Sequence, residues 1–137
     1  MKQHRRGDWN TVVYAAENDV WRQKRNGVRD LMPPEARAFA NTILESETWQ
    51  HGPVEVRFHS KGHGSYAHVH HSERYISLSR LQLHTAIVVH ELAHMACPPH
   101  EGHGRLFRAA YLELCEEHLP VYAPKLARAL AARGVSL

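Results

Sequence analysis

The feature that most constrains the fold is an apolar stretch between residues 81 and 96 that carries the polar group His90-Glu91-Leu92-Ala93-His94. Apolar residues recur there every three to four positions, which predicts an α-helix. The residues just before His90 are Ile87, Val88 and Val89, so we expect this helix to be buried. Buried imidazoles and carboxylates are costly without partners. The sequence therefore predicts a partner for this polar group.

The spacing of the polar group favours a metal ion as that partner. His90 and His94 are four residues apart, so their imidazoles project from one helix face and can bind one zinc ion. Glu91 lies on the neighbouring edge of the same face, where its carboxylate can reach a metal-bound water without binding the metal. Zinc lowers the pKa of such a water to about 7. The pattern predicts metal-assisted hydrolysis of an amide, with Glu91 as the general base.

Two other interpretations use the same residues. One is a core helix with two hydrogen-bonded histidines, and the other is a zinc-stabilised module that binds protein or nucleic acid without catalysis. A purely structural zinc site needs no base and more often closes its fourth position with a protein ligand. Glu91 therefore favours the hydrolase.

The following loop offers three candidates for a third ligand. His100 follows His94 by six residues, as in metzincins, but Cys97 stands where those enzymes have a glycine that allows the turn. Cys97 itself would have to stay helical against Pro98, which disfavours the α conformation before it. His103 lies between two glycines that let the backbone come close. We favour His103.

The rest of the chain predicts an α+β domain. Helical spacing predicts helices over 9–26, 33–49, 81–96, from Gly104 onward, and over 124–133. Alternating apolar and polar residues predict strands over 54–59, 66–70 and 74–78, in a small, mainly antiparallel sheet. We expect one domain over 1–137, with residues 1–8 flexible.

Composition narrows the function classes. The chain has 137 residues, two cysteines, 13 histidines and a net charge of +3. Two cysteines cannot form a secreted disulfide framework, which predicts a reducing, cytoplasmic location. No stretch approaches the roughly 18 apolar residues of a membrane span, so no membrane partner is expected. The basic residues near the N-terminus are expected on solvated faces, and they support nucleic-acid binding only weakly.

Residues 90–107 also carry a resemblance. His90-Glu91-x-x-His94, an eight-residue loop and His103-Gly104-x-x-Phe107 resemble the SprT-like (Spartan-type) zinc metallopeptidases. The chain is similar over most of 9–132, and most strongly over 86–107, to small metallohydrolases of actinobacteria and their phages. The resemblance does not extend to the separate DNA- and partner-binding regions of Spartan-type enzymes.

The resemblance implies a minimal zincin-like fold that acts on a protein or peptide substrate. It implies one zinc ion on His90, His94 and His103, with Glu91 as the catalytic base. It also implies that a strand beside the zinc helix, here Tyr75 to Ser79, holds an extended peptide by backbone pairing.

Other residues are given minor roles. Tyr66 and Tyr75 are candidates to stabilise an oxyanion, because such a site needs a donor opposite the metal. His68 is expected on an exposed edge strand, and the alternative is that it lies close enough to the cleft to contact substrate. Arg108 is assigned to a solvated helix face. Cys97 near zinc could be oxidised or compete for the metal.

Overall fold

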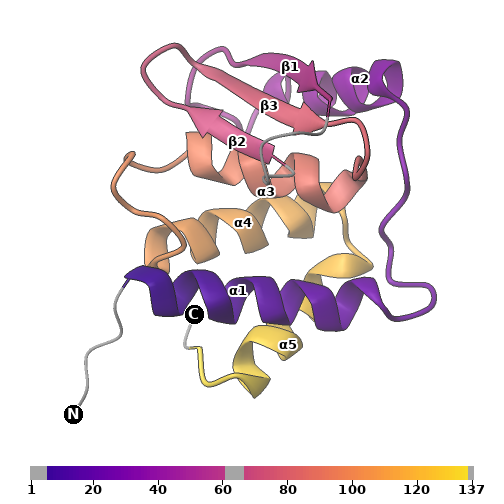
Figure 1. Cartoon of the computed structure of the whole chain (residues 1–137), viewed down its shortest axis with the longest axis vertical. Helices are drawn as coiled ribbons and strands as arrows, with labels where there is room; N and C mark the ends of the chain where they lie inside the picture. The colour runs from indigo at the N-terminus through magenta and orange to yellow at the C-terminus, as the bar shows by residue number, and fades with distance from the viewer. Residues whose placement is uncertain (1–5, 61–66, 136–137) are drawn as a thin grey trace. The chain divides into compact units, whose positions relative to one another are not determined.

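The computed structural model describes residues 6–60 and 67–135, and the α+β class is confirmed there (Figure 1). The elements are α1 (Arg6–Trp21), α2 (Pro33–Leu44), β1 (Glu55–His59), β2 (Ala67–His70), β3 (Tyr75–Ser79), α3 (Thr85–Met95), α4 (Arg105–His118) and α5 (Tyr122–Ala132). The chain divides into two compact units, one formed by residues up to 28 and from 97 onward, the other by 29–96. Whether they act as one domain stays a prediction.

The first unit is helical and contains α1, α4 and α5. Within it, α5 packs against both α1 and α4. Apolar residues three to four apart on each helix meet in a common core, which includes Val13, Ala16, Val20, Phe107, Leu114, Leu126 and Leu130. None of the helices within 6–60 and 67–135 is long and apolar enough to cross a membrane.

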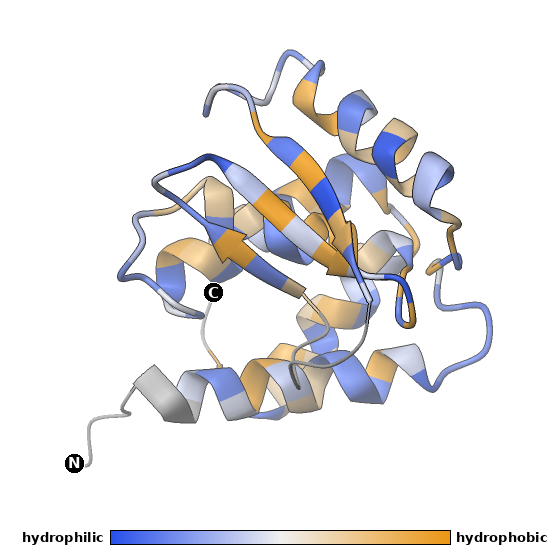
Figure 2. Cartoon of the chain, turned by 45° about the horizontal axis from the view of Figure 1, so that its top comes forward, coloured by the Kyte–Doolittle hydropathy of each residue, from blue (hydrophilic) through white to orange (hydrophobic). Residues whose placement is uncertain are grey.

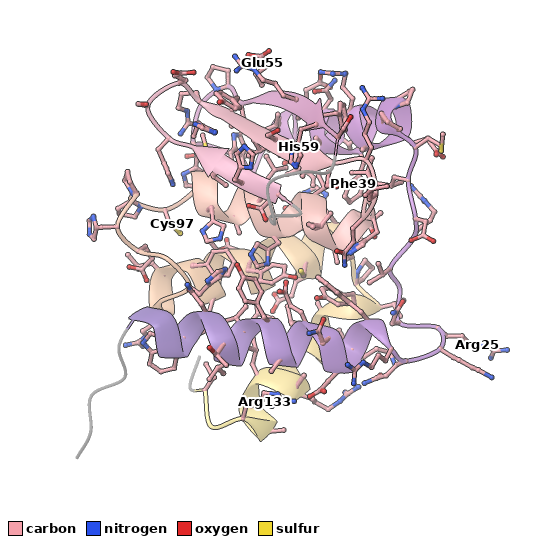
Figure 3. The ribbon with its side chains drawn as sticks, in the orientation of Figure 1. Arg25, Phe39, Glu55, His59, Cys97 and Arg133 are labelled. Carbon is pink, nitrogen blue, oxygen red and sulfur yellow. The ribbon has the colours of Figure 1, made fainter. Side chains whose placement is uncertain are left out.

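The first helix ends earlier than the sequence predicts. It was expected to run from residue 9 to 26, but it begins at Arg6 and ends at Trp21. The Asn26 side-chain amide donates to the carbonyl groups of Val20 and Trp21, both at 3.2 Å. These bonds give carbonyl groups at the helix end a hydrogen-bond donor. Arg25 has a φ of 54°, and its exposed side chain points away from this turn (Figure 3).

The sheet of the second unit is mixed, not mainly antiparallel as expected. Its order is β1-β3-β2, with β1 parallel to β3 and β2 antiparallel to β3. Four of the five residues of β3 are buried, which suits the central position, whereas β1 and β2 form the edges. Tyr66, the first residue of the expected second strand, lies outside the described residues.

The two faces of the sheet differ in polarity, because hydrophobic and hydrophilic residues alternate along the strands (Figure 2). Val56, Ile76 and Val69 lie side by side on one face, in register across the three strands. Helix α2 packs on β1, α3 packs on β2 and β3, and the two helices touch each other, so both cover this apolar face. The core of the second unit therefore lies between the sheet and α3.

The opposite face of the sheet carries polar rings. The His59 and His68 rings stack with centroids 5.1 Å apart, and His59 Nδ1 lies 2.7 Å from the Ser77 hydroxyl oxygen. The His70 ring stacks on Tyr75 at 4.2 Å. These contacts form a polar surface layer on the sheet, and Figure 3 shows the His59 side chain on it.

Helix α3 begins at Thr85, four residues later than the sequence predicts. His84 is its N-cap, because its Nδ1 atom accepts a 3.2 Å hydrogen bond from the Ile87 amide. The Thr85 hydroxyl oxygen accepts from the Arg29 amide at 3.1 Å, and the Thr85 amide donates to the Arg29 carbonyl at 2.9 Å. An imidazole cap is unusual, which is why the sequence pattern placed the helix start too early.

Helix α2 also ends before its expected end. It was predicted to run to Trp49, but its last helical residue is Leu44. The Ser46 hydroxyl donates a 2.6 Å hydrogen bond to the Ile43 carbonyl, and the Trp49 amide donates to the Ser46 carbonyl at 3.2 Å. Serine competes for backbone groups in this way and favours a turn over further helix.

Candidate metal centre

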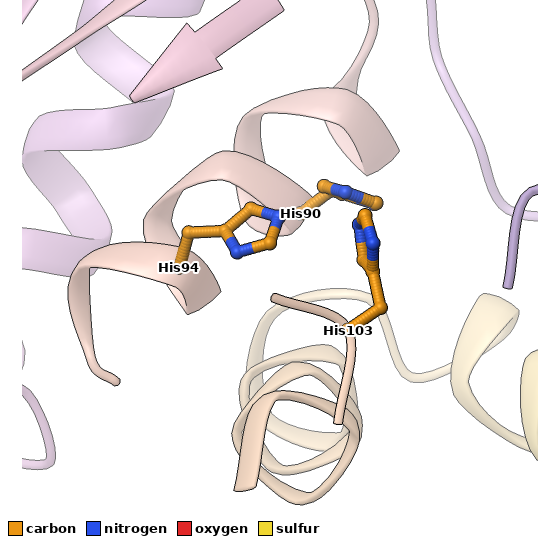
Figure 4. A group of neighbouring side chains, drawn as sticks. All are labelled: His90, His94 and His103. Atoms are coloured by element: carbon orange, nitrogen blue, oxygen red, sulfur yellow. The ribbon is translucent and has the colours of Figure 1, made fainter. Parts of the chain in front are cut away.

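Two of the candidate ligands lie on α3 in the second unit. His90 is 4% exposed, and His94 is half-buried one turn further along the same face (Figure 4). Their ring centroids are 5.1 Å apart, with the ring planes at 61°. Two imidazoles on one tetrahedral zinc ion, with Zn–N bonds of about 2.0–2.1 Å, have centroids about 5.2 Å apart. The separation of this pair therefore fits a shared zinc ion.

The carboxylate of Glu91 lies beside the first of these ligands. Its Oε2 atom is 3.9 Å from His90 Nε2, and Glu91 is 7% exposed. Burial of a carboxylate next to an imidazole keeps bulk water from screening the pair. Glu91 is therefore placed to exchange a proton with a molecule that approaches His90.

The C-terminal end of α3 is held by an arginine in the turn between β2 and β3. Arg74 donates to the carbonyl groups of His51, Pro53 (3.3 Å) and Met95 (3.5 Å). The positive charge of Arg74 near the last turn of α3 also interacts favourably with the helix dipole. Together with the His84 cap, these bonds fix both ends of the helix that carries the two histidines.

The third candidate, His103, immediately precedes Gly104, the N-cap of α4 in the first unit, and is 4% exposed. Its Nδ1 atom forms a hydrogen bond with Asn10 Oδ1 on α1. Its ring meets the Tyr14 ring edge-on at 5.0 Å and the Phe107 ring at 4.7 Å. The Arg108 guanidinium donates to the His103 carbonyl at 3.0 Å. Both the ring and the backbone of His103 are therefore held within this unit.

Gly104 is needed by the cap that follows His103. The Glu101 Oε2 atom accepts a 2.8 Å hydrogen bond from the Leu106 amide at the start of α4. A Cβ atom at Gly104 would meet that same oxygen and would lie 3.0 Å from the Glu101 Cδ atom. The glycine therefore lets the Glu101 side chain cross the backbone and cap the helix.

The three histidines form a group that could hold a metal ion. One ring nitrogen of each lies within 4.8 Å of the others, and it is the only such group of His, Cys, Asp or Glu found in the described part of the chain (Figure 4). His100 is exposed and Cys97 is a buried free thiol, and neither belongs to the group. Burial, and then the charge of Glu101, raise the pKa of the Cys97 thiol to about 11.

Several minor assignments made from the sequence need correction. Arg108 is not on a solvated face: it is 4% exposed, and its guanidinium lies 4.3 Å from the centroid of the Trp9 ring. The role of Tyr75 as an oxyanion donor stays a prediction, and the Arg57 guanidinium carbon lies 3.7 Å from the centroid of the Tyr75 ring on the polar face of the sheet. His68 is half-buried in the same ring stack.

The strand expected to hold a peptide also needs correction. Tyr75–Ser79 is β3, the central strand, whose two edges are already paired with β1 and β2. A strand with both edges paired cannot add a further strand. The outer strands of the described sheet are β1 and β2.

Sequence reasoning did not identify Asn10 as a residue of the site, and it assigned Arg108 to a solvated helix face. Asn10 and Tyr14 are four residues apart on α1, so the spacing places both on one face. Nothing in the local pattern indicates that this face meets His103, which follows Asn10 by 93 residues.

Comparisons of the chain with protein-family models, with curated proteins and with solved structures give no match. Function is therefore inferred from the residues of the site.

Proposed function

We propose that this protein is a zinc-dependent metallopeptidase of the SprT-like kind, with His90, His94 and His103 as metal ligands and Glu91 as general base. The observation that carries the proposal is the group of three imidazoles beside a buried carboxylate. Three protein ligands with an open fourth position are typical of catalytic zinc sites, whereas structural sites are closed by four.

A bound zinc ion supplies Lewis acidity toward water and toward a peptide carbonyl group. Glu91 accepts a proton from the attacking water, whose oxygen bonds to the carbonyl carbon. Glu91 then delivers that proton to the amide nitrogen as the C–N bond breaks. The second proton of the water passes from the new carboxylic acid to the amine, so the products are a carboxylate and an ammonium group. The low exposure of Glu91 excludes bulk water that would compete for the proton.

The edge of β2 offers a place for an extended substrate. Helix α3 packs against β2 within the second unit, so this edge strand lies next to the helix that carries His90 and His94. An extended peptide adds to such an edge through main-chain hydrogen bonds, with alternate side chains on each side. We infer that peptides bind along β2, not along β3.

Both cysteines of the described residues are free and buried thiols. This is consistent with a reducing compartment, and we propose a cytoplasmic location on that basis.

The proposal is tested by zinc content and by peptide cleavage. Elemental analysis of the wild type should give one zinc per chain, unchanged in His100→Ala and lowered in His103→Ala. A peptide library read by mass spectrometry should show cleavage by the wild type. Glu91→Gln should keep zinc and lose cleavage by about 10²–10⁴-fold.

Three results would contradict the proposal in different ways. A wild type without zinc under metal-replete conditions would exclude the metal centre. Loss of zinc in His100→Ala, with zinc retained in His103→Ala, would move the third ligand to His100. Zinc binding with no cleavage of any peptide would favour the zinc-stabilised binding module over the enzyme.

A further inference from the structure

We propose that Asn10 is a positioning residue that holds His103 in the tautomer required for metal binding. The inference rests on the proposed function, because it assigns a role within the same site. It is carried by contacts inside the first unit, where the Oδ1 atom of Asn10 faces the Nδ1 atom of His103.

The chemistry of the contact determines which ring nitrogen of His103 carries the hydrogen. A carbonyl oxygen has lone pairs and no hydrogen, so the bond requires a hydrogen on His103 Nδ1. A neutral imidazole carries only one ring hydrogen, and its lone pair then lies on Nε2. Nε2 is thereby the nitrogen of His103 that can bind a metal ion. A partner that donated to Nδ1 would leave the hydrogen on Nε2 and prevent this.

The neighbouring contacts hold the ring without choosing its tautomer. Tyr14, one helical turn after Asn10, and Phe107 meet the His103 ring edge-on at interplanar angles of 70° and 88°. Arg108 bonds the His103 carbonyl and acts on the backbone. The Asn10 contact, by contrast, reaches a ring nitrogen of His103 through a hydrogen bond.

Partners of this kind have measurable effects in metal sites. Ligand histidines usually donate their second ring N–H to a carboxylate or carbonyl, and loss of that partner typically lowers metal affinity by about 10- to 100-fold. Asn10→Leu removes the acceptor. Asn10→Asp keeps an oxygen in the same place, and a carboxylate oxygen is a stronger hydrogen-bond acceptor than an amide oxygen. Asn18→Leu is the matched control, because it places the same side chain at an exposed position of α1.

The experiment reads the tautomer and the metal separately. The ¹⁵N chemical shifts of the imidazoles are measured in the metal-free protein at pH 8, and zinc affinity is measured by chelator competition. In the wild type, Asn10→Asp and Asn18→Leu, we expect His103 to carry its hydrogen on Nδ1. In Asn10→Leu we expect a shift toward Nε2–H and a zinc affinity lower by about 10- to 100-fold.

The two readouts distinguish failure of this inference from failure of the proposed function. His103 protonated on Nε2 in the metal-free wild type would overturn the role of Asn10, whatever zinc does. Unchanged zinc affinity in a folded Asn10→Leu variant, with helical circular dichroism and melting close to those of Asn18→Leu, would overturn it too. A wild type that holds no zinc would overturn the proposed function, and the ¹⁵N shifts would still decide whether Asn10 sets the tautomer.

Discussion

The Tyr111 hydroxyl donates a 2.6 Å hydrogen bond to the Glu17 carboxylate, which lies 94 residues earlier in the chain and is 1% exposed. The Tyr111 and Tyr122 hydroxyl oxygens are 2.9 Å apart, and Tyr122 accepts a hydrogen bond from the Trp21 indole at 3.1 Å. Burial, and then the charge of Glu17, raise the pKa of the Tyr111 phenol well above its usual value. Tyr111 therefore stays a donor at neutral pH.

Removal of this donor should destabilise the protein. We expect Tyr111→Phe to lower the free energy of unfolding by about 2 kcal/mol, because a hydrogen bond to a buried charged group is lost. Urea denaturation at pH 7 measures the change. Glu17→Gln in the same background completes a double-mutant cycle, and strictly additive effects of the two changes would show that the bond contributes nothing.

Zinc should stabilise the folded protein if the proposed centre exists. A ligand that binds only the folded state at 100 times its dissociation constant adds about 2.7 kcal/mol. We therefore expect the melting temperature to rise with zinc concentration in the wild type and in His100→Ala, whose side chain is exposed. The rise should be lost in His103→Ala. Equal shifts in both variants would argue against His103 as a ligand.

Gly104→Ala should disturb the helix cap next to His103. The new methyl group meets the Glu101 carboxylate that caps the Leu106 amide, so we expect a loss of about 0.5–2 kcal/mol, typical of a lost N-terminal cap. The control is the same change in a Glu101→Ala background, where the clash is absent and at least half of the penalty should disappear. If Gly104→Ala lowers the stability just as much in the Glu101→Ala background, the cause lies in the backbone and not in the Glu101 side chain.

The Cys97 thiol should react slowly at neutral pH. Its pKa is raised to about 11, so about 0.1% is thiolate at pH 8, and the thiolate is the reactive form. The alkylation rate with iodoacetamide should rise about tenfold per pH unit between pH 8 and 10. Cys97→Ser should abolish the reaction, because burial also raises the pKa of the remaining thiol, Cys115, well above its usual value. A rate that levels off near pH 9 would contradict this.

The helices and strands were predictable because their signals are local. Apolar spacing located the five helices and three strands of residues 6–60 and 67–135, but it missed ends that depend on particular side chains. Asn26 takes up carbonyls at the end of α1, and His84 caps the start of α3. The position of β3 in the centre of the sheet also escaped prediction, because pairing between β1 and β3 is non-local.

In the candidate site, too, the residues with a local sequence signal were predicted, and those that depend on non-local contacts were not. His90, Glu91 and His94 were predicted as site residues from their spacing alone, and their side chains lie close together on α3, but their roles stay predictions. His103 was favoured over His100 from its glycine neighbours, and its role as a ligand stays a prediction. Asn10 was not identified, because its contact joins segments that are distant in sequence.

The discontinuous first unit has a consequence for folding during synthesis. Residues 29–96 form a continuous segment, so all partners within this unit have left the ribosome before α4 and α5 are made. Helix α1 emerges before this segment, whereas its partner α5 is made after it. The apolar face with Val13, Ala16 and Val20 therefore lacks its α5 partner until α5 has been made. A nascent chain in this state is a natural client for ribosome-associated chaperones.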